Sequence, residues 1–200
     1  MKNLFRDHSY NMVKMFLNQF ATAIFGFSLA LAAGKAQNPT LRNVTSIGAI
    51  LFYLFLLYTM TWEIGFRERV GVLHGRIKNQ PYKGALICLI ANLPNFLFAI
   101  LITLGAFVSQ GVCATLAAFG RTAALLLEGM YTGILAQTVN GVALHQHWFV
   151  YFLIPIPAIL VCGIAYLLGL KDVKFTALFN QEYPESDREP KKKRWEREDD

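Results

Sequence analysis

The chain has 200 residues, of which 54% are hydrophobic and 16% are charged, with a formal net charge of +6. The charges are segregated, because 17 of the 32 charged side chains lie between Lys171 and Asp200. No charge occurs in the 18 residues from Thr45 to Trp62. At 1.5 Å per residue such a run is long enough for a helix that crosses the hydrocarbon layer. Together these features exclude an ordinary water-soluble domain and indicate an integral membrane protein.

Four apolar runs have the length of a membrane span. None shows the two-residue alternation of a transmembrane barrel, so helices are expected, because lipid offers no partner for backbone amides. The sequence predicts an all-α fold, a polytopic transmembrane helical bundle of four spans with an outer re-entrant or interfacial helical segment. The predicted divisions are an N-terminal segment 1–14, a transmembrane bundle 15–170 with spans 15–34, 45–66, 85–108 and 148–170 and an outer segment 112–144, and a charged tail 171–200.

The first predicted span resembles a secretory signal sequence in one respect. Ala30 and Ala32 have the spacing that a signal peptidase accepts, and basic residues precede the apolar run. The apolar run is longer than the 7 to 15 residues usual for a signal peptide. We therefore expect this segment to remain as a span, with cleavage as the alternative.

Lysine and arginine mark the side of the membrane on which each connection lies, because they are retained in the cytoplasm. They are frequent in the N-terminal segment, between the second and third spans, and after the last span, but sparse in the other two connections. The residues on the predicted cytoplasmic side are Lys2, Arg6, Lys14, Arg67, Arg69, Arg76, Lys78, Lys83, Lys171 and Lys174. We expect both termini in the cytoplasm and a multi-pass protein of the cell membrane, such as the bacterial inner membrane.

The segment from Val112 to Leu144 does not fit a simple span. Its 33 residues would be about 50 Å long as one helix, too long for one crossing and too short for two. We expect helical pieces on the outer side, broken near Gly120 or at Asn140 and Gly141. A fifth full crossing is the main alternative.

Two charges, Arg121 and Glu128, lie inside this segment. On a continuous helix they would share one face, but seven residues apart they are too distant for a direct i,i+4 pair. Each would cost about 2.5 to 3.5 kcal/mol at the centre of a bilayer, so each must reach water, the bundle interior or a partner. They either line a polar site or extend separately to the outer surface.

The third predicted span contains Asn92, Pro94 and Asn95. A proline in mid-span removes a backbone hydrogen bond and disturbs the preceding turn, so carbonyl groups and two amides could gather at membrane depth. Pro155 and Pro157 predict a similar disturbance in the last span. The residues of the predicted polar site are Asn92, Asn95, Arg121 and Glu128.

Motifs for catalysis or metal binding are absent from the sequence. There is no nucleophile elbow, phosphate-binding loop, paired metalloprotease histidine or C-x-x-C spacing. The three cysteines are isolated, and His145 and His147 have no acidic or thiol neighbour to complete a zinc site. We expect no enzymatic activity, no cofactor and no metal.

The predicted cytoplasmic loop is strongly basic. Arg67, Arg69, Arg76, Lys78 and Lys83 are expected to face the lipid bilayer and to attract anionic headgroups. We expect Arg67 also to pair with Glu63, four residues earlier. The tail from Asn180 is dense in charges of both signs, which predicts disorder and no nucleic-acid binding despite its KKKR run.

Small residues at four-residue spacing predict close helix packing. Gly26, Ala30 and Gly34 form one stripe, and Gly129 and Gly133 form another. With no catalytic motif, the sequence favours an accessory, regulatory or assembly component that acts through a membrane-protein partner. The alternative is a small homo-oligomeric transporter or channel with a polar site at a broken helix.

Overall fold

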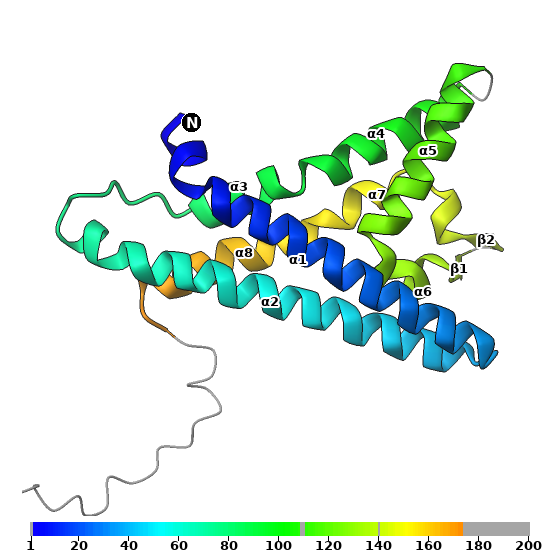
Figure 1. Ribbon diagram of the computed structural model, residues 1–200, viewed down its shortest axis with the longest axis horizontal. Coiled ribbons are helices and arrows are strands. Elements are labelled where there is room, and N and C mark those ends of the chain that lie inside the picture. The colour runs from blue at the N-terminus through cyan, green and yellow to red at the C-terminus, as the bar shows by residue number, and fades with distance from the viewer. Residues whose placement is uncertain (1, 109–110, 140, 174–200) are drawn as a thin grey trace, which may run out of the picture.

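The computed structural model describes residues 2–108, 111–139 and 141–173, and these are almost entirely helical (Figure 1). In the described residues, eight α-helices follow one another, with two short 3-10 turns and one two-stranded hairpin. The elements are α1 Lys2–Lys35, α2 Pro39–Leu73, α3 Lys83–Ala91, α4 Leu93–Phe107, α5 Val112–Leu127, η1 Gly129–Tyr131, α6 Thr132–Leu135, β1 Thr138–Val139, β2 Val142–Ala143, η2 Leu144–Gln146, α7 Val150–Leu153 and α8 Pro155–Leu170.

Helices α1 and α2 form a long antiparallel hairpin (Figure 1). The turn between them is closed by Asn38, whose side chain accepts a hydrogen bond from the Leu41 amide at 3.1 Å, and Pro39 begins α2. With 34 and 35 residues, both helices exceed the length needed to cross the hydrocarbon layer. The segment 1–14, predicted as separate from the first span, is therefore continuous with it from Lys2 onward.

Helices α3 and α4 together make one bent element. They meet at Asn92 with an angle of 54°, and Pro94 occupies the first turn of α4, where its missing amide leaves no hydrogen bond unmade. The predicted break in the third span is confirmed. In the last span the disturbance is slight, because Ile154 between α7 and α8 keeps helical dihedral angles of −56° and −44°.

Helix α5 returns antiparallel to α4 and then turns sharply. The bend between α5 and the η1–α6 segment is 85° and falls at Glu128. The prediction of a break at Gly120 is wrong, since this glycine lies within α5, buried against α4. Gly141 has a φ of +81° and lies between the paired strands β1 and β2, whereas Asn140 is outside the described residues.

Small residues bring the helices into close contact, as predicted. A β-carbon at Gly129 would lie 2.5 Å from the Ala23 carbonyl oxygen of α1, and one at Gly133 would lie 2.5 Å from the Arg42 carbonyl oxygen of α2. The η1–α6 segment can therefore pack directly on the α1–α2 hairpin. Gly34, by contrast, has no atom within 4 Å of such a position.

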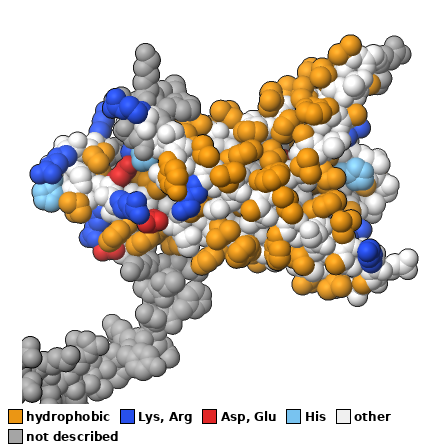
Figure 2. All heavy atoms as spheres, viewed as in Figure 1, with side chains coloured by type: hydrophobic (Ala, Val, Ile, Leu, Met, Phe, Trp, Pro, Cys, Tyr) orange, Lys and Arg blue, Asp and Glu red, His pale blue; other side chains and the backbone are white. Residues whose placement is uncertain are grey.

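The surface of the bundle suits a membrane. Three helices are long and apolar enough to cross it, and up to five crossings result if each bent pair counts as one. Figure 2 shows hydrophobic side chains over the middle of the molecule and most charged side chains at one end. The exact number of crossings, four or five, stays a prediction, as does the side on which each end lies.

The basic segments nevertheless share one end of the bundle. The N-terminal part of α1, the α2–α3 connection and the end of α8 lie together there (Figure 1). Contacts between His8 and Glu68 and between Arg69 and Asp172 join these segments. The tail after Val173 lies outside the described residues.

Candidate functional site

Two of the predicted site residues meet at the break between α3 and α4. Asn92 and Asn95 are each 2% exposed. The Asn92 amide donates to the Cys88 carbonyl oxygen at 2.9 Å, and its side-chain oxygen accepts from the Asn95 amide at 2.9 Å. The side-chain oxygen of Asn95 is buried without a hydrogen-bond partner in the described residues.

Glu128 is buried in the bundle interior at the bend after α5. Its side chain is 1% exposed, and neither carboxylate oxygen has a hydrogen-bond partner among the described residues. Glu128 directly follows Leu127, the last residue of α5, and the helix dipole places partial negative charge at this end of the helix. Both the burial and the helix end disfavour a negative charge here unless a proton or a cation compensates it.

The backbone around Glu128 is firmly held. Gln19 of α1 donates to the Leu127 carbonyl oxygen at 3.2 Å. Ser46 of α2 donates to the Met130 carbonyl oxygen at 2.7 Å and accepts from the Gly133 amide at 2.9 Å. These hydrogen bonds fix the bend against the α1–α2 hairpin, so the carboxyl group is positioned by the fold and not by a partner of its own.

Two tyrosines are buried in the same bundle interior as the amides and the carboxyl group. Tyr53 of α2 and Tyr131 of η1 belong to the same buried core, and the Tyr131 hydroxyl donates to the Ile154 carbonyl oxygen at 3.5 Å. We call Asn95, Asn92, Tyr53, Tyr131 and Glu128 the interior polar row. Its members come from α2, from the α3–α4 break and from the α5–η1 bend, and all are nearly inaccessible to solvent.

Arg121 does not belong to this row. Its side chain is exposed on α5, whereas Glu128 lies in the interior beyond the end of that helix. In the described residues, no hydrogen bond or ion pair joins Arg121 to Glu128. The four predicted site residues therefore separate into the amide pair, the interior carboxyl group and an exposed cation.

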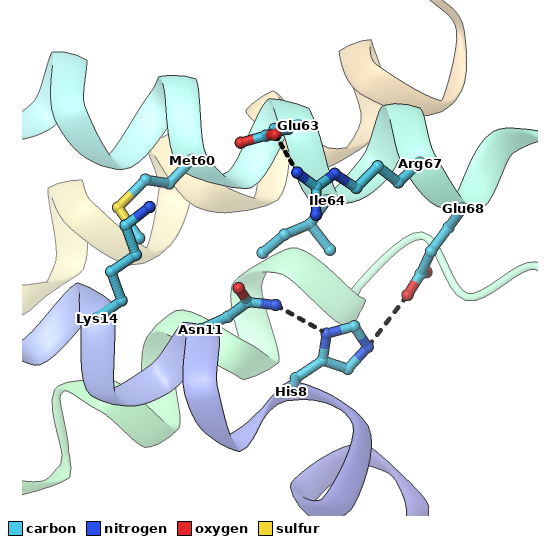
Figure 3. A pocket seen from close by; sticks show the side chains of 8 residues that line it. All are labelled: His8, Asn11, Lys14, Met60, Glu63, Ile64, Arg67 and Glu68. Carbon is cyan, nitrogen blue, oxygen red and sulfur yellow. Dashed lines mark hydrogen bonds and ion pairs between the residues drawn. The ribbon is translucent and has the colours of Figure 1, made fainter.

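A second polar cluster, centred on Glu68, lies at the charged end of the bundle. The Lys83 ammonium and the Tyr166 hydroxyl each donate to its carboxylate at 2.6 Å, and His8 Nε2 lies 3.0 Å from it. Asn11 Nδ2 lies 3.3 Å from His8 Nδ1, as Figure 3 shows. A neutral imidazole with its proton on Nε2 satisfies both contacts of His8.

Glu68 lies two residues beyond the predicted span 45–66, near the end of a 35-residue helix that is longer than the hydrocarbon layer requires. Burial by itself would raise the pKa of this carboxyl group. Hydrogen bonds from His8, Lys83 and Tyr166 outweigh burial and lower the pKa from 4.5 to about 2. Glu68 is thus a fully compensated anion.

Sequence reasoning missed the Glu68 cluster. His8, Glu68, Lys83 and Tyr166 come from four helices, and no linear spacing relates them. The one available signal was that Glu68 is a lone acid within a strongly basic stretch.

The predicted lipid-facing basic loop is only partly available to lipid. Arg67 pairs with Glu63, as expected from their spacing, Arg69 pairs with Asp172, and Lys83 pairs with Glu68. Arg76 and Lys78 are exposed in the connection between α2 and α3. Attraction to anionic headgroups therefore remains a prediction that rests mainly on these last two.

Other candidate ligands are scattered. No group of three or more His, Cys, Asp or Glu side chains able to hold a metal occurs in the described residues. The ring of His145 contacts the Leu135 carbonyl oxygen at 3.3 Å. Cys88 of α3 and Cys162 of α8, which looked isolated in the sequence, are both fully buried.

Comparisons of the chain with protein-family models, with curated proteins and with solved structures found no match. The site must therefore be interpreted from its own residues.

Proposed function

We propose that the protein is a small membrane transporter or channel in which Glu128 carries a transported or coupling proton. The observation that supports this proposal is a buried carboxyl group, 1% exposed, with no hydrogen-bond partner for either oxygen in the described residues. Ionisable groups inside a membrane protein are expensive and usually mark an ion pathway or a proton relay.

A proton suits this group better than a divalent metal ion. Calcium and magnesium require several oxygen ligands, commonly from more than one carboxylate. The described residues contain no acidic neighbour of Glu128 that would complete such a set. A single proton neutralises one carboxylate fully, and its release and uptake switch the charge at the bend.

The interior polar row supplies further polar groups that could take part in this exchange. The free side-chain oxygen of Asn95 and the hydroxyl groups of Tyr53 and Tyr131 can accept or donate hydrogen bonds to water or to a polar solute. The broken helix between α3 and α4 is the type of element at which transporters bind ions or substrates. A role as an accessory subunit stays a prediction that no contact in the bundle favours.

The experiment is a proton-flux assay in proteoliposomes that contain a pH-sensitive dye. A potassium gradient with valinomycin drives proton entry. We expect flux above that of protein-free liposomes for the native protein and a loss of most of this flux for Glu128→Gln. The matched control is Asp172→Asn, which removes a carboxylate that is 39% exposed at the charged end of the bundle and should retain the flux. Equal flux in all three proteins, or none in the native protein, would remove the proposal.

A further inference from the structure

A pocket of about 220 Å³ opens between the N-terminal half of α1 and the C-terminal half of α2 (Figure 3). Asn11, Lys14 and His8 project from α1, and the facing wall is formed by α2. The volume is below the 300 to 1,000 Å³ typical of sites for drug-sized ligands. It suits a small polar group.

The surroundings of the pocket place it at the level where lipid tails meet headgroups. On α1, Tyr10, Val13 and Leu17 alternate with the pocket residues and are 75%, 56% and 56% exposed. On α2, Phe66 and Val70 are 40% and 61% exposed beside it. In the same helical turns, apolar side chains therefore face outward and polar side chains line the pocket. This arrangement is typical of residues at the interface between lipid tails and headgroups.

Side chains of both positive and negative charge line the pocket. Lys14 and Arg67 are cations, and Glu63 is an anion close to Arg67. Glu68 belongs to the wall, but Lys83, Tyr166 and His8 already compensate it. The remaining lining thus offers two positive groups and one negative group, at the boundary of the apolar surface.

The pair between Glu63 and Arg67 leaves both groups able to accept new partners. Their side chains are 53% and 74% exposed. Exposed i,i+4 pairs contribute little to stability, so a ligand can replace this contact with its own. Arginine and lysine bind phosphate oxygens through charge-assisted hydrogen bonds, and a carboxylate binds a primary ammonium in the same way.

We propose that this pocket binds a phosphoethanolamine group, that of a zwitterionic phospholipid at the membrane surface. Lys14 and Arg67 hold the phosphate, the Asn11 amide donates to a phosphate oxygen, and Glu63 accepts from the ammonium. Met60 and Ile64 form the apolar wall along which the glycerol end leaves the pocket toward the lipid. This site is separate from Glu128 and does not depend on the transport proposal.

The test measures lipid binding to the full-length, delipidated protein in detergent by native mass spectrometry. The probes are phosphatidylethanolamine, phosphatidylcholine and phosphatidylglycerol with identical acyl chains. We expect the native protein to bind phosphatidylethanolamine about fivefold more tightly than phosphatidylcholine, because a quaternary ammonium cannot donate the hydrogen bond to Glu63. Glu63→Gln should abolish this preference while binding of both lipids remains.

Variants on the phosphate side complete the test. Lys14→Gln and Arg67→Gln should each weaken binding of all three lipids. Lys78→Gln, which removes an exposed lysine outside the pocket, should leave binding of the two zwitterionic lipids, phosphatidylethanolamine and phosphatidylcholine, unchanged. Retention of the ethanolamine preference by Glu63→Gln, or equal binding by Lys14→Gln and Lys78→Gln, would overturn the proposal.

A competition with water-soluble glycerophosphoethanolamine identifies the source of the ligand. If it displaces the lipid at similar concentration, the same contacts serve a soluble phosphoester. If a large excess is needed, the membrane lipid is the ligand, which is the result we expect. Both results support phosphoethanolamine recognition by the pocket.

Discussion

Two glutamates of this bundle, the partly buried Glu68 and the fully buried Glu128, have opposite surroundings. Glu68, at the charged end, contacts a lysine, a tyrosine and a histidine, whereas Glu128, in the interior, has no hydrogen-bond partner among the described residues. A compensated carboxylate joins segments of the fold, and an uncompensated one weakens it. Glu68 therefore stabilises the bundle, whereas the burial of Glu128 without a partner requires a functional explanation.

The largest stability effect is expected at Glu68. Glu68→Gln leaves the Lys83 ammonium and His8 without their anion, and hydrogen bonds to charged groups contribute about 1.5 to 3 kcal/mol. We expect the free energy of unfolding, measured by SDS titration in detergent, to fall by about 2 to 3 kcal/mol. Glu63→Gln, in an exposed pair, should lower it by less than about 0.5 kcal/mol. Equal effects of both substitutions would contradict the assignment of Glu68 as a structural anchor.

The next largest effect should come from packing beside Glu128. A β-carbon at Gly129 would lie 2.5 Å from the Ala23 carbonyl oxygen, so Gly129→Ala forces the bend away from α1. We expect a loss of about 1 to 3 kcal/mol in the same titration. Gly48→Ala is the control, because no atom lies within 4 Å of its β-carbon position in α2. A neutral Gly129→Ala would show that the bend does not need close contact with α1.

Substitution of Glu128 itself should have a smaller effect of opposite sign. Glu128→Leu removes a buried polar group that has no partner, and the cost of leaving such a group unsatisfied is about 1 to 3 kcal/mol. Because leucine differs in shape, we expect a net gain of about 1 kcal/mol in the free energy of unfolding. A loss as large as that of Glu68→Gln would mean that Glu128 is compensated in the folded protein.

The smallest expected effect is a dependence of the free energy of unfolding on pH that comes from Glu68. Its pKa is about 2 in the folded protein against 4.5 ordinarily, so its contribution to stability is complete above about pH 4.5 and declines as the pH falls toward 2. The difference in unfolding free energy between the native protein and Glu68→Gln, followed from pH 6 to pH 4, should therefore shrink as the pH falls. Parallel curves would contradict the lowered pKa.

The sequence predicted the features that depend on local composition. Long apolar runs identified the helices suited to a membrane, and the Asn92–Pro94 stretch identified the broken helix. The pattern of lysines and arginines correctly grouped the segments that share one end of the bundle.

The features that the sequence did not predict depend on contacts between distant segments. The break after α5 falls at Glu128 and not at Gly120, because the packing of Gly129 and Gly133 on α1 and α2 decides it. The Glu68 cluster requires four helices to meet, so no spacing along the chain reveals it. Arg121 and Glu128 would share a face only if the helix continued through the bend.

The central claim, that Glu128 is an interior carboxyl group without a protein partner that exchanges a proton, can be tested by infrared difference spectroscopy. Spectra of the reconstituted protein would be recorded during a pH titration. We expect a protonated-carboxyl band that changes with pH in the native protein, persists in Glu68→Gln and is missing in Glu128→Gln. The same band in native protein and Glu128→Gln would contradict the claim.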